Sequence, residues 1–118
     1  MKDKRVAIYV RVSTKDQSVD MQLNDLERYS KERGLSIFKV YKDNGVSGTK
    51  ESRPALNELM NDAKKKKFDV VLVWRFDRFA RSTKHLVTAL YEFRNLGIDF
   101  ISYQENIDTS SPLGEAIF

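Results

Sequence analysis

Apolar residues gather in four short runs along the chain. The first run, RVAIYV, combines β-branched and aromatic residues without a breaker, which is typical of a buried strand. The third run, DVVLVW, is the strongest of the four. The runs occupy residues 5–10, 36–41, 69–74 and 98–102. The pattern therefore predicts four strands.

The segments between these runs carry apolar residues at spacings of three and four, which is typical of amphipathic helices. Asp20 is a typical N-cap residue for the first helix, and Gly34 is its stop signal. Pro54 suits the first turn of the second helix, where its missing N–H costs nothing. The predicted helices cover residues 20–33, 54–67 and 82–96, and one more begins at Ser111-Pro112.

The order of these elements is β-α-β-α-β-α-β-α. Such alternation predicts an α/β fold with a mainly parallel four-stranded sheet and helices on both faces. The 118 residues, of which 41% are hydrophobic, suit a single domain with one core. The last helix is cut short at Phe118, so we expect the chain to be a fragment of a longer protein.

Composition narrows the possible chemistry. There is no cysteine, which excludes disulfides and thiolate metal sites, and the single histidine, His85, argues against His-rich metal clusters and a Ser–His–Asp triad. The net charge of +4 is compatible with a polyanionic partner. No apolar run approaches the roughly 20 residues of a membrane span, and no signal peptide is recognisable. The expected location is the cytoplasm.

Ligands of open α/β sheets bind beyond the carboxyl ends of the strands. In this chain the segments after the first three strands contain hydroxyls and arginines, and guanidinium groups bind phosphate oxygens in a forked geometry. The residues concerned are Arg11, Ser13, Thr14 and Gln17, then Asn44, Ser47, Gly48 and Arg53, then Arg75, Asp77, Arg78 and Arg81.

The third of these segments has an arginine every three residues. On a tight helical turn Arg75, Arg78 and Arg81 would share one face, while Phe76 and Phe79 would point toward the core. An isolated pattern of this kind is more often a solvated basic face than a site. A lone serine after a strand is likewise more often a cap than a nucleophile.

Four blocks taken together resemble the resolvase/invertase family of serine recombinases. They are Tyr9-Val10-Arg11-Val12-Ser13-Thr14 with Gln17 and Asp20-Met21-Gln22, then Asp43-Asn44-Gly45-Val46-Ser47-Gly48, then Arg53-Pro54, and then Phe76-Asp77-Arg78-Phe79-Ala80-Arg81. They follow the family's order and spacing across nearly the whole chain. Residues 43–52, DNGVSGTKES, are rich in Gly, Asn and Ser, which predicts a loop. This second loop lacks the lysine of many small resolvases, and Phe79-Ala80 stands where Leu-Gly is frequent. With Arg53-Pro54, this loop is closer to the large serine recombinases and serine transposases.

The resemblance implies a site-specific DNA recombinase. Ser13 would attack a DNA phosphodiester and give a 5′-phosphoseryl link with a free 3′-hydroxyl. Strand exchange and reversal of the attack would then rejoin the DNA without ATP. Arg11, Arg78 and Arg81 would hold the scissile phosphate, joined by Arg53. Asp77 would hold this arginine network or handle the proton of the leaving group.

The resemblance also implies supporting residues, which are Tyr9, Gln17, Gln22 and Ser47. No cofactor and no metal are expected, so arginines would supply the charge that Mg²⁺ supplies in other phosphoryl transfers. The group that takes the proton from Ser13 stays open among an arginine, Asp77, water and the phosphate.

Family members act on double-stranded DNA as homodimers that pair into a tetramer. Residues 1–118 would form the catalytic domain, and the dimerisation helix would begin near Ser111 and continue beyond the chain, as would a separate DNA-binding domain. The first alternative is a catalytically silent nucleic-acid-binding module, which needs Arg78 and Arg81 but not Ser13. A metal-dependent nuclease and a nucleotide-binding regulator are further alternatives, although RVSTKDQ has no glycine to form a phosphate cradle.

Overall fold

The computed structural model describes residues 4–13, 19–45, 54–80, 82–105 and 107–109. For residues 12, 13, 19, 44, 45, 77, 78 and 107 the description is of the backbone alone. The helix predicted from Ser111 lies outside the described residues.

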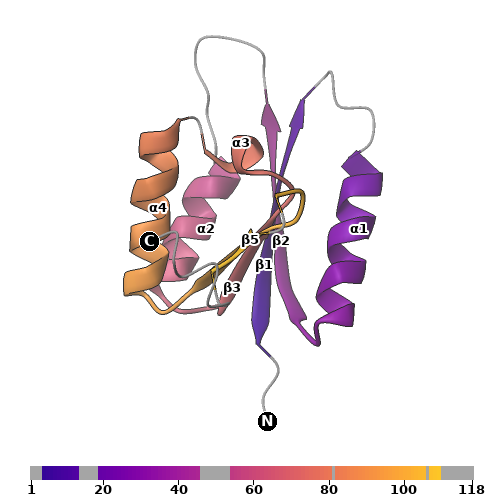
Figure 1. Cartoon of the computed structure of the whole chain (residues 1–118), viewed down its shortest axis with the longest axis horizontal. Helices are drawn as coiled ribbons and strands as arrows, with labels where there is room; N and C mark the ends of the chain where they lie inside the picture. The colour runs from indigo at the N-terminus through magenta and orange to yellow at the C-terminus, as the bar shows by residue number, and fades with distance from the viewer. Residues whose placement is uncertain (1–3, 14–18, 46–53, 81, 106, 110–118) are drawn as a thin grey trace.

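A single sheet runs through the middle of the molecule (Figure 1). Its strands lie in the order β2-β1-β3-β4-β5; the first four are parallel, and β5 is antiparallel to β4. The mainly parallel four-stranded sheet is thus confirmed, and the two-residue strand β5 is an addition that the apolar pattern missed. The bounds are β1 Arg5–Ser13, β2 Ser36–Gly45, β3 Val70–Val73, β4 Asp99–Ser102 and β5 Ile107–Asp108.

Strands β1 and β2 are both longer than predicted. The apolar runs ended at residues 10 and 41, but the parallel ladder continues until Ser13 pairs with Gly45. Residues 43–45, which were predicted as the start of a loop, therefore belong to β2. The polar ends of the two strands pair with each other, which a hydrophobic pattern does not detect.

Helix α1 covers one face of the sheet, and α2, α3 and α4 lie on the other (Figure 1). The bounds are α1 Val19–Glu32, α2 Pro54–Lys64, α3 Phe76–Phe79 and α4 Thr83–Asn95. The predicted stops Gly34 and Gly97 both have positive φ, +70° and +72°, which glycine adopts without strain.

Two predicted helix limits need correction. Helix α1 begins at Val19, so Asp20 lies in its first turn and does not cap it. In the first turn its negative charge still interacts favourably with the positive end of the helix dipole. Helix α2 ends at Lys64 and does not run on to Lys67, because the chain turns through Lys66, whose φ is +56°.

Apolar side chains cover both faces of the central strands. Along β1, Ile8 packs with Leu26 of α1, whereas Tyr9 packs with Leu59 of α2 and with Phe79 on the opposite face. This alternation holds the helices against the sheet and fixes the directions in which the strand ends point. None of the described helices combines the length and the apolar character that a membrane span requires.

Candidate functional site

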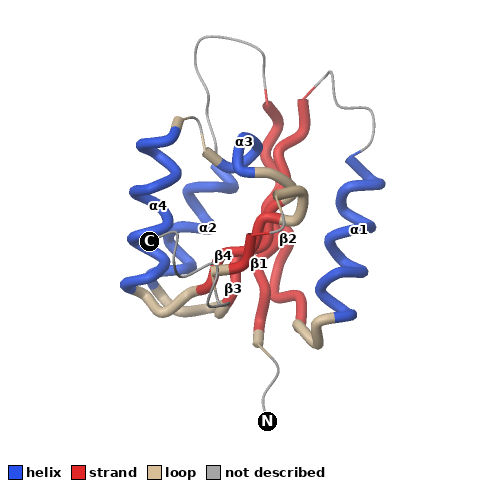
Figure 2. The backbone as a smooth tube through the Cα atoms, in the orientation of Figure 1, coloured by secondary structure: helices blue, strands red, loops and turns tan. Residues whose placement is uncertain are grey.

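The carboxyl ends of β1, β2 and β3 lie together, as the sequence predicted. Arg11 pairs in register with Asp43, Ser13 with Gly45, and Tyr9 with Val73. Helix α3 follows β3 within three residues and lies against β1 (Figure 2). We call this side of the molecule the carboxyl end of the sheet.

Tyr9 contacts both the apolar core and a polar group at the carboxyl end of the sheet. Its side chain is fully buried, and its ring meets the ring of Phe79 edge-on, with the centroids 6.0 Å apart. Its hydroxyl donates a hydrogen bond of 2.9 Å to Oδ2 of Asp43. The ring of Tyr9 is therefore part of the core, while its hydroxyl contacts a buried carboxylate.

Asp43 is the functional candidate that sequence reasoning missed. Its side chain is 2% exposed and accepts hydrogen bonds from the backbone N–H of Ala55, at 2.8 Å, and of Leu56, at 3.0 Å, besides the one from Tyr9. A carboxylate at the end of β2 thus caps the start of α2 from a distance. In the sequence, Asp43 stands at the start of the predicted loop of residues 43–52 and carries no signal of its own.

Helix α3 carries the positions of Asp77 and Arg78 on a single turn. The predicted apolar anchors are confirmed: Phe79 is fully buried 5.1 Å from the ring of Phe100, and Phe76 is partly buried against the same core. The idea that three arginines share one helical turn is wrong. Arg75 precedes the turn with φ −148° and ψ 156°, and the turn is already over at Ala80.

Two further predicted site residues, the supporting residue Gln22 and the catalytic residue Arg11, lie at the same end of the sheet. Gln22 is the fourth residue of α1 and is only 6% exposed, and no hydrogen bond between described residues involves its carboxamide. Arg11 is partly buried on β1, next to Asp43 in the ladder.

The other predicted site residues divide into two groups. The backbone alone is described for Ser13 at the last position of β1 and for Asp77 and Arg78 in α3. Gln17, Ser47, Arg53 and Arg81 lie outside the described residues. The roles of these seven residues stay predictions.

Toward the opposite, amino end of the sheet, hydrogen bonds lower the pKa values of two carboxylates, Asp69 and Asp62. The pKa of Asp69 is lowered chiefly because its carboxylate accepts a hydrogen bond from the Arg5 backbone. The pKa of Asp62 is lowered chiefly by the hydrogen bond from the Tyr41 hydroxyl, and burial raises the pKa of Tyr41. Among the described residues, no group of three or more histidines and carboxylates is arranged to hold a metal ion.

The sheet and the residues at its carboxyl end define an α/β domain whose candidate chemistry lies beyond the ends of parallel strands. The chain belongs to the family described as "Resolvase, N terminal domain", whose model matches residues 6–118.

Named relatives agree with this assignment. The chain is 38% identical over 110 residues to the transposon Tn917 resolvase of Enterococcus faecalis and 41% identical over 110 residues to the serine recombinase gin of Escherichia phage Mu. Each match covers 93% of this chain, but 55% and 52% of the two relatives. The chain thus spans about half the length of the curated relatives it matches.

A solved structure matches the fold in detail. The N-terminal catalytic domain of TP901-1 integrase superposes with a TM-score of 0.86 and is 43% identical, over 97% of this chain and 88% of that one. Both the expected fold class and the expected family are confirmed.

Proposed function

We propose that this chain is the catalytic domain of a serine recombinase and that Ser13 is its nucleophile toward DNA. The observation that carries the proposal is the meeting of three segments at one end of the sheet. Strand β1 ends at Ser13, α3 bears Arg78, and the start of α2 is anchored by Asp43 directly after Arg53. Membership of the resolvase family supports the same assignment.

The proposed reaction is an in-line phosphoryl transfer. The Ser13 hydroxyl oxygen bonds to phosphorus, the bond to the 3′ oxygen breaks, and the DNA is left with a 5′-phosphoseryl link and a free 3′-hydroxyl. A 3′-hydroxyl of the exchanged strand later attacks the same phosphorus and releases Ser13. Because each step exchanges one phosphoester for another, no ATP is needed.

Arginines are the proposed source of transition-state stabilisation. The transferring phosphoryl group spreads negative charge over its equatorial oxygens, and preorganised cations lower the barrier. Arg11, Arg78 and Arg81 are proposed to hold these oxygens, and Arg53 to join them. Asp77 is proposed to orient this network or to protonate the leaving oxygen.

Contacts among the described residues at the carboxyl end of the sheet support the proposed placing of the arginines. Tyr9 packs on the side of the sheet that α2 and α3 cover, and alternate positions of a strand share a face, so Arg11 falls on the same side. The bond from Tyr9 to Asp43 ties that strand to the first turn of α2. Gln22 is proposed to use its buried carboxamide for positioning at the same end, as are Gln17 and Ser47.

The intact protein is proposed to act on double-stranded DNA in the cytoplasm, as a homodimer that pairs into a tetramer. Its dimerisation helix and DNA-binding domain are proposed to follow this domain. The matched relatives, which are about twice as long as this chain, leave room for both.

The decisive experiment is a search for the covalent intermediate. The intact protein is incubated with DNA flanking its gene and quenched with denaturant, and we expect an adduct that survives denaturation. Ser13→Ala should abolish it without changing the unfolding midpoint, while the control Ser36→Ala, at the start of β2, should leave it intact. Salt-sensitive DNA binding without an adduct would instead favour the catalytically silent binding module.

A further inference from the structure

The loop after β4 reaches across to helix α3. Its contact is Glu105, whose Oε1 accepts a hydrogen bond of 3.1 Å from the backbone N–H of Phe76, the first residue of α3. The hydroxyl of Ser102, the last residue of β4, donates to the same oxygen. One carboxylate oxygen therefore links the end of β4 to the start of α3.

Helix α3 depends on such contacts because it is a single turn. Four residues are too few for a helix to be stable alone, and the first N–H groups have no partner within the helix. The N-cap residue, Arg75, offers no side-chain hydrogen bond to them. Glu105 supplies the missing acceptor and places negative charge at the positive end of the turn.

Both partners of this contact are held firmly. On the loop side, the N–H of Tyr103 bonds to the carbonyl oxygen of Val73 at 3.0 Å, and the N–H of Gln104 bonds to that of Trp74 at 2.9 Å. Ser102 itself is fully buried. The loop that carries Glu105 is thus attached to the end of β3, close to the point where α3 begins.

On the helix side, the described packing contacts of α3 come from its apolar residues Phe76 and Phe79. The ring of Phe76 stacks on Phe100 with the centroids 5.9 Å apart, and Phe79 is buried beneath the turn. The hydrogen bond from Phe76 to Glu105 adds a directional restraint at the first residue of the turn. The backbone of Asp77 and Arg78 follows directly after this restrained position.

We propose that Glu105 is a positioning residue that sets where α3 presents Arg78 and Asp77, and that Ser102 orients the Glu105 carboxylate. The proposal rests on the proposed recombinase function. Glu105 acts through the backbone of α3 and makes no contact with the phosphate. What matters is an oxygen acceptor at this point rather than a negative charge.

The test compares Glu105→Ala with Glu105→Gln in the intact protein, on DNA flanking its gene. The alanine variant lacks the acceptor, whereas glutamine keeps an oxygen that can accept both hydrogen bonds. Because misplacing a catalytic group by about 1 Å costs on the order of 100-fold, we expect Glu105→Ala to form the covalent adduct roughly 10- to 100-fold more slowly. Glu105→Gln should recover most of the rate, and DNA affinity should change less than about 2-fold in both, since the restraint acts on the transition state.

The matched control is Glu92→Ala, which removes a carboxylate of α4 whose described partner is Lys64 at 3.8 Å. It should leave the adduct rate unchanged. Amide hydrogen exchange gives a second reading without DNA: Phe76 N–H should exchange faster in Glu105→Ala than in the parent and the glutamine variant.

Ser102→Ala completes the design. It should slow the reaction less than Glu105→Ala does, and it should add nothing in the Glu105→Ala background, because its effect passes through that carboxylate. Equal adduct rates in Glu105→Ala and the parent, or a loss that glutamine does not restore, would overturn the proposal. Absence of any Ser13-dependent adduct in the parent would instead overturn the recombinase function on which the proposal rests. In that case amide exchange still tests the contact: unchanged exchange of the Phe76 N–H in Glu105→Ala would show that Glu105 does not hold the start of α3.

Discussion

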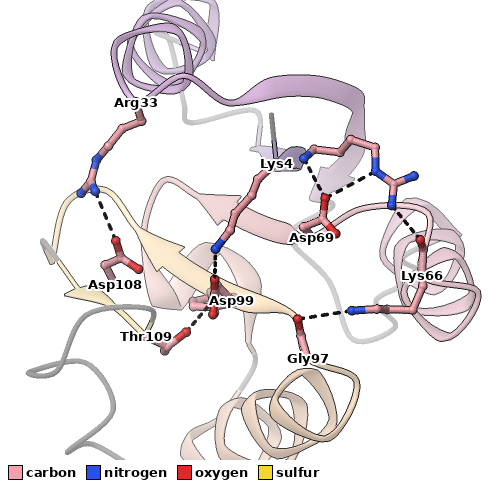
Figure 3. Close-up of polar contacts among 10 residues, drawn as sticks. Lys4, Arg33, Lys66, Asp69, Gly97, Asp99, Asp108 and Thr109 are labelled. Atoms are coloured by element: carbon pink, nitrogen blue, oxygen red, sulfur yellow. Dashed lines mark hydrogen bonds and ion pairs between the residues drawn. The ribbon is translucent and has the colours of Figure 1, made fainter. Parts of the chain in front are cut away.

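At the amino end of the sheet the carboxylates of Asp69 and Asp99 bind cationic side chains, whereas at the carboxyl end Asp43 and Glu105 bind backbone N–H groups and hydroxyls. Figure 3 shows Lys4 extending to Asp99 at the amino end. The charged atoms of Lys4 and Asp99 are 3.3 Å apart, and those of Arg5 and Asp69 are 3.4 Å apart. Carboxylates thus serve two purposes at opposite ends of the same sheet.

The contacts at the amino end are mostly exposed ion pairs. The side chain of Lys4 is 59% exposed and that of Arg5 46% exposed, so water and salt weaken the attraction. Few backbone groups take part in these contacts. Asp69 also accepts from the Arg5 N–H at 2.9 Å, and the guanidinium of Arg5 donates to the carbonyl oxygen of Lys66 at 3.0 Å. This end therefore contributes to stability in small increments.

The carboxylates at the carboxyl end determine where helices begin. Asp43 accepts from the first turn of α2, and Glu105 from the first residue of α3. A hydrogen bond to the backbone restrains a whole segment of the chain. The two restrained segments, the starts of α2 and α3, adjoin the proposed catalytic residues Arg53 and Arg78 in the sequence. We therefore expect substitutions of acidic residues at the carboxyl end to change reactivity, and those at the amino end to change stability alone.

The largest expected effect is that of Asp43→Ala. The variant leaves the Tyr9 hydroxyl and the N–H groups of Ala55 and Leu56 without their buried partner, which should lower the free energy of unfolding by about 2–4 kcal/mol. Adduct formation should fall as well, even under conditions where the variant is folded. Urea unfolding and the adduct assay measure the two effects; Asp25→Ala, which removes a surface pair with Arg28, is the control. Full reactivity in folded Asp43→Ala would contradict the comparison.

Asp69→Ala should have a smaller effect of a different kind. It removes the acceptor for the Arg5 N–H and the partner of its guanidinium, so we expect a loss of about 1–2 kcal/mol in urea unfolding. The rate of adduct formation should stay at the parental value once the protein is folded. A slowed reaction would mean that the two ends of the sheet are not independent.

The fold was largely predictable because its strands are apolar and its helices are bounded by glycine and proline. Gly34, Gly97 and Pro54 each mark a helix limit through backbone geometry that few other residues share. The missed elements carry no such signal. Strand β5 has two residues, and the polar ends of β1 and β2 are strands only because they pair with each other.

The candidate site was predictable in its location but not in its internal support. The topology of a parallel sheet brings the segments after β1, β2 and β3 together, so a reader of the sequence can place Ser13 and Arg78 at one end. Asp43 and Glu105 act on N–H groups that are 12 and 29 residues away along the chain. No local pattern encodes such a tertiary contact.

Acid should reveal the contribution of Asp62, in the last turns of α2 toward the amino end. Its pKa lies below the ordinary value of 3.8, chiefly because the Tyr41 hydroxyl donates to it, with Lys67 and Lys39 adding attraction. A lowered pKa in the folded state gives stability that is present above the unfolded value and is lost as pH falls through the folded one. The free energy of unfolding should therefore decrease between about pH 5 and pH 2.

Tyr41→Phe sharpens this expectation. Without the hydroxyl the pKa of Asp62 should rise, so the acid-dependent loss of stability becomes shallower, while stability at neutral pH falls by about 1 kcal/mol. Carboxyl carbon shifts followed by NMR give the pKa, and urea unfolding at several pH values gives the slope. The control Tyr91→Phe, on the exposed side of α4, should alter neither. An unchanged Asp62 titration in Tyr41→Phe would assign the low pKa to the lysines instead.

The smallest expected effect is that of Lys4→Ala at the amino end. Lys4 meets Asp99 in an exposed pair, and such pairs contribute less than about 1 kcal/mol, so the unfolding free energy should fall by no more than about 0.5 kcal/mol. The difference should shrink further in 1 M salt, where charges are screened within about 3 Å. Urea unfolding at low and high salt measures it. A loss above 1 kcal/mol that persists in salt would show that this end of the sheet, too, depends on directional contacts, and the contrast with Asp43 and Glu105 would no longer hold.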